Sequence, residues 1–584
     1  RRNPMAHFPA LLRPSRWLQA VASRFSGGLI VGLALFPFTL SAGAAWSADR
    51  LILSYGLLAR SLPVDSLRVY AEEGTIDADL RSYGPFINNE QLAQLRQVLN
   101  ARAELSPVAV AQFLYTKQGE ILLNRLGNVI RTESNLSGFY AIRSALILAA
   151  SEPEGLSLLN VLDSFPHEEI RIDLTETLRI AGDLSALIRQ TQAAIALVEQ
   201  QADQEASTQS TVEFAVLPDL RRPGEYTWQK NTLELNDRRR NRSFPVDLYL
   251  PQTQAQAQVT AAPLIVISHG LGSDRTSYGY LARQLASHGF VVAVPEHPGS
   301  NAQQLQALIS GSASQVTSPN EFIDRPLDIK YLLNRLDALN RNNPRFRGRF
   351  NVQQVGVIGQ SLGGYTALAL AGGRINSAQL TEECARSESE TLNLSLLLQC
   401  RAAELSLPIP NLKDDRVKAI IAINPIGSSL IGAADFAAIQ IPVMLVSSSA
   451  DTVSPALLEQ IVPYSWLTTP NKYLVMLQGG THFSTISKDE TRSEDLVELP
   501  PQIVGPNPLL AQTYLRSLSV AFLQTYVADR PGYTPYLESA YAQLISRPDL
   551  PVRLVRSITA EQIAQITGTP VPDPNGTETR TSRR

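Results

Sequence analysis

Ser361 stands where a serine can act as a nucleophile. It is the centre of Gly359-Gln360-Ser361-Leu362-Gly363, a G-x-S-x-G pattern that directly follows a short apolar run. On a sharp turn from strand to helix, the two glycines let backbone segments approach closely and the serine hydroxyl is presented for reaction. Apolar residues 352–358 predict the strand, and small residues 365–373 predict the helix. We interpret Ser361 as a nucleophile; the alternative is a structural Ser-Gly turn.

The general base that such a serine needs is found by counting histidines. When a serine on this kind of turn acts with an acid and a histidine, the acid comes next along the chain and the histidine last. Only His482 lies after Ser361; the other histidines are His7, His167, His269, His288 and His297. We therefore predict His482 as the base. A lone histidine in a loop is otherwise structural, which is how we interpret His167.

The acid that orients the base should follow the end of a strand between Ser361 and His482. Asp451 comes directly after the apolar run 442–450, at the edge of a sheet where such sites are built. Its ionised form would fix the imidazole tautomer and stabilise the imidazolium. Asp435, in a loop and helix stretch, and Glu459, in a helix, are the alternatives.

Two backbone N–H groups are predicted to stabilise a tetrahedral oxyanion. One belongs to Leu362, which follows the nucleophile, and the other to Leu271 in the loop after an earlier strand. We expect His269, in the same loop, to hold the loop by hydrogen bonds. His297 borders the predicted site, and we interpret it as a pocket wall or a structural hydrogen-bonding residue.

The elements that must position these residues form an α/β pattern. The two first strand candidates can make a hairpin, and the later ones are continuous apolar runs separated by helical segments, as in a buried parallel sheet. The candidates are 227–235, 244–250, 264–268, 290–294, 352–358, 417–424, 443–448 and 473–477. This order predicts the mostly parallel eight-stranded sheet of an α/β-hydrolase fold over residues 213–550, with an amphipathic helix at 508–527.

The rest of the chain has a different composition. Residues 49–200 are helical in period, which predicts an all-helical N-terminal domain, and the polar stretch 201–212 predicts a linker. Residues 1–44 contain arginines, an apolar run of 14 residues and small residues before a cut after Ala44, which predicts a signal peptide and a periplasmic or secreted protein. An uncleaved anchor is the alternative. The tail 568–584 is predicted to be disordered.

An insertion at 374–416 is longer than the usual connection after such a helix. Its leucines, Leu392, Leu394 and the run 396–398, predict a lid or pocket wall that offers apolar surface to an acyl chain. Both cysteines of the chain, Cys384 and Cys400, lie inside it. In an oxidising compartment they would form one bridge that closes this loop. Two free buried thiols are the alternative.

Charge excludes one class of function. The net charge of −3 gives no electrostatic basis for binding nucleic acid. The one dense basic run, residues 236–242, lies between two strand candidates, so we interpret it as a solvated hairpin turn, with a binding patch as the alternative.

With these residues placed, the chain resembles cyanobacterial α/β hydrolases that carry an N-terminal helical domain of unknown function. Its catalytic half is also similar to dienelactone-hydrolase-like proteins and platelet-activating-factor acetylhydrolases. Residues 268–301 and GQSLGGYTALALAG carry the likeness, which covers about residues 50–545. It implies a catalytic triad of Ser361, Asp451 and His482, and an oxyanion hole of Leu271 and Leu362. Gln360 departs from these families, which often have histidine there.

The reaction that we expect is hydrolysis of a carboxylic ester through an acyl-enzyme, without a cofactor or a metal ion. A serine peptidase of the same fold and a catalytically silent binding protein are the alternatives. The expected partner is a small-molecule or lipid ester, and with a lipid the contact would be peripheral to a membrane. The sequence does not indicate an oligomeric state.

Overall fold

The computed structural model describes residues 47–568 except 57, 85–86, 210–211, 254–260, 388–392 and 488–500. The predicted signal peptide, all but the first residue of the predicted tail, and Leu392 therefore lie outside the described residues. Within that part of the chain, no helix combines the length and the hydrophobicity that are needed to cross a membrane.

The N-terminal part is not all helical, which corrects the prediction for 49–200. A four-stranded sheet has the order β2-β1-β6-β4, and two further strands pair with each other. The strands are β1 (Arg50–Tyr55), β2 (Leu58–Pro63), β3 (Arg102–Ala103), β4 (Ile130–Thr132), β5 (Leu156–Ser157) and β6 (Glu169–Asp173). The helices are α1 (Val64–Glu73), α2 (Ala78–Arg81), α3 (Asn89–Asn100), α4 (Pro107–Leu114), α5 (Lys117–Val129), α6 (Phe139–Ala149) and α7 (Leu158–Asp163).

Helix α8 (Leu174–Thr208) replaces most of the predicted linker, so the linker prediction is wrong for residues 201–208. Ala194, Val198 and Ala202 are fully buried in the same hydrophobic cluster as the large sheet. These three residues are spaced by four, so they form one narrow stripe along the helix. The polar residues between them face other directions, which explains why the segment resembles a linker in sequence.

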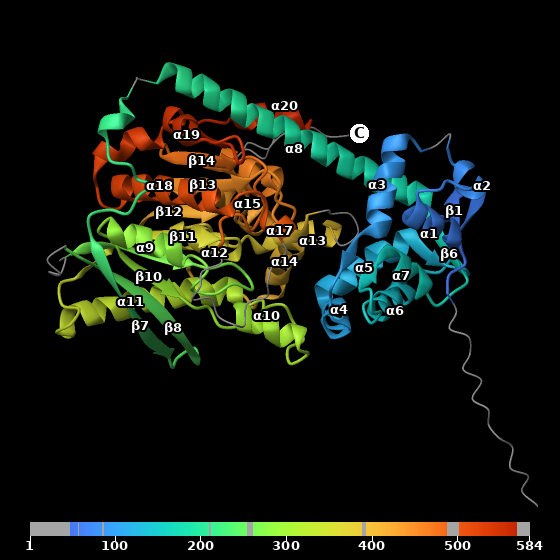
Figure 1. The fold of residues 1–584 in the computed structure, drawn as a ribbon. Coiled ribbons are helices and arrows are strands. Elements are labelled where there is room, and N and C mark those ends of the chain that lie inside the picture. The colour runs from blue at the N-terminus through green and yellow to red at the C-terminus, as the bar shows by residue number, and fades with distance from the viewer. Residues whose placement is uncertain are drawn as a thin grey trace, which may run out of the picture. The chain divides into compact units, whose positions relative to one another are not determined.

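A nine-stranded mixed sheet forms the core of the second part, one strand more than predicted (Figure 1). Its order is β15-β14-β13-β12-β11-β9-β10-β8-β7, and the six strands from β14 to β10 are parallel. The strands are β7 (Thr227–Asp237), β8 (Arg242–Gln252), β9 (Ala262–Ser268), β10 (Val291–Pro295), β11 (Phe350–Gln360), β12 (Val417–Ile423), β13 (Val443–Ser448), β14 (Lys472–Leu477) and β15 (Val552–Val555). The added strand β15 extends this part beyond residue 550.

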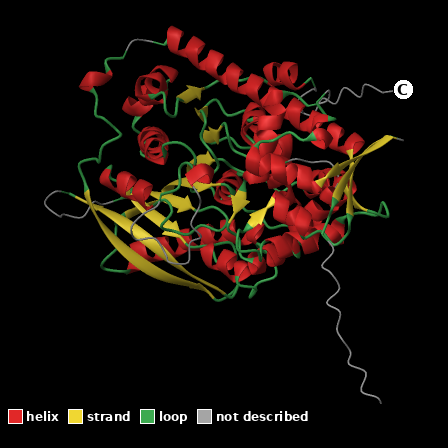
Figure 2. Ribbon diagram, turned by 45° about the vertical axis from the view of Figure 1, so that its right-hand side comes forward, coloured by secondary structure: helices red, strands yellow, loops and turns green. Residues whose placement is uncertain are grey.

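Helices cover both faces of this sheet, as its continuous apolar strands require (Figure 2). One face packs on α8, α11 (Glu321–Asn342), α12 (Leu362–Ala371), α15 (Ser428–Ala437), α16 (Val462–Trp466) and α20 (Ala560–Thr567). The other packs on α9 (Gly279–Ser287), α18 (Pro508–Tyr526), α19 (Ser539–Ile545) and the 3₁₀ segment η4 (Pro531–Leu537). This architecture is the predicted α/β-hydrolase fold.

The remaining helices lie in connections. They are α10 (Ala302–Ile309), α13 (Ser377–Ser387), α14 (Leu394–Gln399), α17 (Pro501–Val504), and the short turns η1 (Phe214–Val216), η2 (Cys400–Glu404) and η3 (Leu457–Ile461). The insertion 374–416 contains α13, α14 and η2, and a disulfide joins Cys384 to Cys400 with the two Cα atoms 5.7 Å apart. The predicted bridge is therefore confirmed, and the alternative of two free thiols is wrong.

Candidate active site

Ser361 lies between β11 and α12 with backbone angles that a serine rarely adopts. Its φ is 55° and its ψ is −117°, and such angles at a non-glycine residue are maintained only when the surroundings impose them. A Cβ at Gly359 would overlap the carbonyl of Gly363, and one at Gly363 would overlap the carbonyl of Ser268. Gly359 is thus required by a close approach within the turn itself, and Gly363 by a close approach between the turn and the end of β9.

The acid and the base meet at the same edge of the sheet. Asp451 follows the end of β13 and His482 follows the end of β14, and Nδ1 of His482 lies 2.7 Å from Oδ2 of Asp451. The other carboxylate oxygen of Asp451 accepts hydrogen bonds from the N–H groups of Val453 (2.8 Å) and Ser454 (2.7 Å). Both side chains are buried. This arrangement holds the proton of His482 on Nδ1 and leaves Nε2 as the basic nitrogen.

The residue before Ser361 contacts the backbone of His482. Nε2 of Gln360 donates a hydrogen bond of 3.2 Å to the carbonyl oxygen of His482. Nδ2 of Asn424, which follows β12, donates to the same oxygen at 3.3 Å. Within the described residues, no hydrogen bond joins the Ser361 hydroxyl itself to His482. Gln360 and Asn424 are positioning residues that no sequence motif indicated.

The two alternative acids have other partners. Oδ1 of Asp435 forms an ion pair of 2.7 Å with Nε of Arg374. Glu459, in the π-helical turn η3, accepts hydrogen bonds from side chains and backbone groups of five other residues in the described part of the chain. None of these residues is His482. Of the three candidate acids, Asp451 is the one that contacts the candidate base.

The predicted oxyanion donors lie on both sides of the turn. Leu362 is the first residue of α12, where a helix leaves backbone N–H groups without helical partners. Leu271 lies in the loop after β9, next to Gly270, where a Cβ would overlap the Gln360 side chain. In the part of the chain that the structure describes, neither N–H donates to a protein acceptor.

His269 and His297 hold the loop that carries Leu271. Nδ1 of His269 lies 2.8 Å from the Gly270 carbonyl, and its Nε2 accepts a hydrogen bond of 3.0 Å from the backbone N–H of His297. Arg325, fully buried in α11, donates from Nη2 to the His269 carbonyl. Burial, and then the positive charge of Arg325, lowers the pKa of His269 to about 3. His269 therefore remains neutral and acts as expected, as a support of the loop.

A second Ser-His-Asp contact exists in the same region. Nε2 of His297 lies 3.0 Å from Oγ of Ser268, and its Nδ1 lies 3.0 Å from Oδ2 of Asp328. The side chains of His297 and Asp328 have no exposed surface, and Ser268 is also fully buried. A substrate cannot reach this set, so His297 is a structural hydrogen-bonding residue rather than a pocket wall.

The basic run at 236–242 forms the predicted hairpin turn between β7 and β8, but the turn is not fully solvated. The side chains of Arg240 and Arg242 are 18% and 12% exposed. Both form ion pairs with Asp328, at 2.9 and 2.8 Å, and Arg242 also pairs with Glu321 at 2.7 Å. The run looks solvent-exposed in the sequence because the acidic partners of its arginines lie on α11, about 80 residues later. No local pattern reveals these partners.

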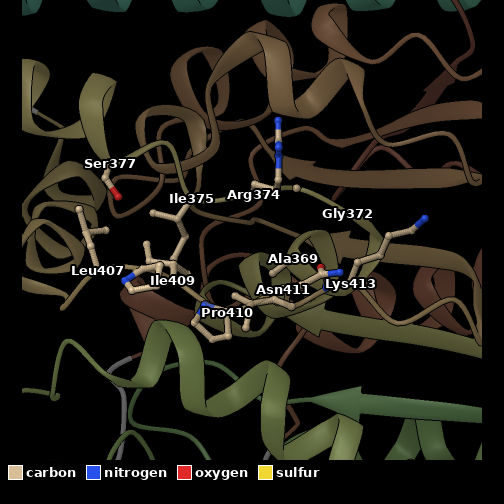
Figure 3. Close-up of a pocket in the computed structure, with 13 residues that line it drawn as sticks. Ala369, Gly372, Arg374, Ile375, Ser377, Leu407, Ile409, Pro410, Asn411 and Lys413 are labelled. Atoms are coloured by element: carbon tan, nitrogen blue, oxygen red, sulfur yellow. Dashed lines mark hydrogen bonds between the residues drawn. The ribbon is translucent and has the colours of Figure 1, made fainter.

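A pocket of about 750 Å³ lies at the far end of the helix that Ser361 begins (Figure 3). Its wall includes Ala369, Gly373 and the segment of the insertion from Leu407 to Lys413, which is neither helix nor strand. Because α12 rises about 1.5 Å per residue, this pocket begins about 12 Å from Ser361. It is therefore separate from the candidate site. The described residues contain no group of three metal-ligating side chains.

Two family models match parts of this chain. Residues 47–173 match the model described as "Alpha/beta hydrolase of unknown function (DUF1400)", and residues 248–323 match "Platelet-activating factor acetylhydrolase, isoform II". The two matched segments, rather than the whole chain, are thus similar to hydrolase families. The second match covers β9, the loop of Leu271, and β10, which are the elements beside the candidate site.

Individual relatives agree with these models. The platelet-activating factor acetylhydrolase of Cavia porcellus is 28% identical over 134 residues, which cover 18% of this chain and 31% of the relative. That of Canis lupus familiaris is 46% identical over 54 residues, 9% of this chain and 12% of the relative. Cutinase 2 of Thermobifida cellulosilytica is 23% identical over 280 residues, 47% of this chain and 71% of the relative. The chain thus spans less than a third of the length of the acetylhydrolases that it matches.

Proposed function

We propose that this chain is a serine-dependent carboxylic ester hydrolase that acts through an acyl-enzyme. The contact between Nδ1 of His482 and Oδ2 of Asp451, at the sheet edge where Ser361 lies, is the observation that carries the proposal. Similarity to acetylhydrolases and to a cutinase, which are ester hydrolases, supports the same class of reaction. The substrate that we propose is a small-molecule or lipid ester.

In the proposed mechanism, Nε2 of His482 takes the proton of Ser361 while Oγ attacks the ester carbonyl. The N–H groups of Leu271 and Leu362 stabilise the oxyanion, and Asp451 stabilises the imidazolium. His482 then gives its proton to the leaving alcohol, and the acyl group stays on Ser361. Water, activated by the same histidine, attacks the acyl-enzyme and releases the acid. The disulfide in the insertion is compatible with the periplasmic or secreted location that we propose.

The test is a series of p-nitrophenyl esters of increasing chain length, together with a fluorophosphonate probe. We expect Ser361→Ala and His482→Ala each to lower kcat by at least about 10³-fold, and Asp451→Asn somewhat less, because triad residues act as a unit. Ser377→Ala, at the start of α13, is the control and should retain activity. The probe should label Ser361 and no other serine. Near-normal activity of Ser361→Ala would show that the site is assigned wrongly, and cleavage of amide but not ester substrates would indicate a peptidase.

A further inference from the structure

Glu459 is a buried carboxylate whose contacts the proposed reaction does not use. It is 1% exposed and lies in the π-helical turn η3, eight residues after Asp451. Within the described residues, no lysine or arginine forms an ion pair with it. A buried carboxylate without a cation is stable only when hydrogen bonds replace its water. The residues that donate hydrogen bonds to Glu459 therefore show which segments of the chain it fixes in place.

Three of these hydrogen bonds come from the insertion. Oε1 of Glu459 accepts from Nδ2 of Asn393 at 2.7 Å, Oγ of Ser395 at 2.7 Å and Nε2 of Gln399 at 2.9 Å. Asn393 is the N-cap of α14 and Gln399 is its last residue. One carboxylate thus contacts both ends of the helix that carries Leu394 and the leucines 396–398.

Three more hydrogen bonds come from the end of the loop after β12 and the first residue of α15. The N–H groups of Gly427 and Ser428 each lie 3.1 Å from Oε2, and Oγ of Ser428 lies 2.8 Å from Oε1. Gln399 strengthens the same junction, because its Oε1 accepts from the N–H groups of Ser429 and Leu430 at 3.1 and 3.0 Å. Glu459 therefore joins the insertion to this loop.

The loop after β12 lies directly beside the candidate site. The carbonyl oxygen of Ile423 accepts the N–H of Ser361 at 2.9 Å. The carbonyl oxygen of Pro425 accepts from Oγ of Ser454 at 2.7 Å, and the N–H of Ser454 donates to Asp451. A helix fixed to this loop is thus fixed relative to both the nucleophile and the acid.

The leucines of α14 differ in how far the rest of the protein covers them. Leu396 and Leu397 are buried, and Leu398 packs against the hydrophobic cluster of the large sheet. Leu394, at the start of the same helix, is half exposed. Leu394 is therefore the leucine of α14 whose apolar surface is open to an apolar ligand.

We propose that Glu459 is a positioning residue that holds α14 beside the site and thereby sets which acyl chains are accepted. This inference rests on the proposed ester hydrolase function. All six contacts of Glu459 are donors to a carboxylate, which only accepts hydrogen bonds. A glutamine at this position would turn an NH₂ group toward some of the same donors. Glu459→Gln should therefore loosen α14 although it changes the shape of the side chain very little.

The experiment compares Glu459→Gln with Asp435→Asn in the full chain. Asp435→Asn also removes one carboxylate that contacts the insertion, but its partner is Arg374 and not α14. For Glu459→Gln, we expect kcat/KM for p-nitrophenyl decanoate to fall at least tenfold while that for the acetate changes less than threefold. Hydrogen exchange of residues 393–399 should become faster. Asp435→Asn should change neither quantity.

Equal changes for the two esters, or unchanged exchange in 393–399, would overturn the proposal. If Glu459→Gln does not fold, the double variant Asn393→Ala, Ser395→Ala removes two of the insertion's contacts, leaves those from Ser428 in place, and is judged by the same two measurements. Failure of the proposed function gives a different result, because then no ester is cleaved and no fluorophosphonate is bound to Ser361. The exchange measurement still reports in that case whether Glu459 holds α14.

Discussion

The side chain of Gln360 donates a hydrogen bond of 3.2 Å to the backbone carbonyl of His482. The residue before the proposed nucleophile thus holds the loop that carries the proposed base. Related families often have histidine at this position, and here glutamine, 2% exposed, links the two loops. The departure from the family pattern is therefore part of how this site is positioned.

Gln360→Leu should slow catalysis without removing the nucleophile. Leucine has a similar size but no donor, so the His482 loop loses one buried hydrogen bond, worth about 1 kcal/mol. We expect kcat to fall roughly five- to tenfold for every ester in the series, with labelling of Ser361 by fluorophosphonate still detectable. Gln353→Leu, on the exposed side of the same strand, is the matched control. Unchanged kcat in Gln360→Leu would refute a positioning role.

The disulfide should stabilise the insertion. In the chain-entropy model, closing a loop of this length contributes about 3 kcal/mol. We expect no alkylatable thiol in the native, non-reduced protein, and faster proteolysis within 374–416 for the double variant Cys384→Ser, Cys400→Ser. Mass spectrometry of the intact protein and of its fragments measures both. Two alkylated cysteines in the native protein would contradict the first expectation.

Acid should destabilise the fold through its buried neutral histidines. The pKa of His269 is lowered to about 3, and burial together with Arg325 also lowers the pKa of His297 well below its usual value. Below an unfolded pKa of about 6.5, the unfolded chain binds protons that the folded chain does not. Stability is therefore complete above pH 6.5 and falls toward pH 3, by at most about 1.4 kcal/mol per pH unit for each histidine.

Urea unfolding between pH 7 and pH 5 tests this dependence. The free energy of unfolding of His269→Gln should fall less steeply with decreasing pH than that of the unchanged protein. Gln353→Leu, an exposed change that adds or removes no titratable group, should leave the slope as it is. Equal slopes for all three proteins would mean that His269 has the same pKa in the folded and in the unfolded protein.

Helix α8 should behave as part of the hydrolase core. Ala194 is fully buried among the residues of the large sheet, whereas Ala196, two positions later, is exposed. Ala194→Asp places an unpaired charge in the core and should lower the free energy of unfolding by at least about 3 kcal/mol. Ala196→Asp, the same change on the outer face, should alter it by less than about 0.5 kcal/mol. Similar losses in both variants would contradict this packing.

Most of the large sheet could be predicted from the sequence because its strands are buried on both faces. Each predicted strand agrees with an observed one, and 443–448 agrees at both ends. The ninth strand β15 has four residues and follows Pro551, so its apolar run is too short to stand out. Strands β1 and β6 pair with each other from about 120 positions apart, and their half-exposed residues give no alternating pattern.

The residues that we propose to react could be predicted from the sequence, whereas the residues that support them could not. Ser361 has a motif, His482 is singled out by chain order, and Asp451 follows a strand. Arg325, Asp328 and Glu459 act through burial and through partners distant in sequence, and a charged residue on a predicted helix normally faces water. Such residues become recognisable only when the fold shows what surrounds them.

The packing of α8 also constrains the order in which the chain can fold as it is synthesised. The apolar stripe of this helix shares its cluster with Val555 and Ile563, residues made more than 350 positions later. Glu205, near its end, accepts hydrogen bonds from the N–H groups of Arg556 and Ser557. The helix therefore leaves the ribosome with an uncovered apolar face that stays open until the last strand arrives. Chaperones or a translocating channel would meet the N-terminal part while the hydrolase core is still incomplete.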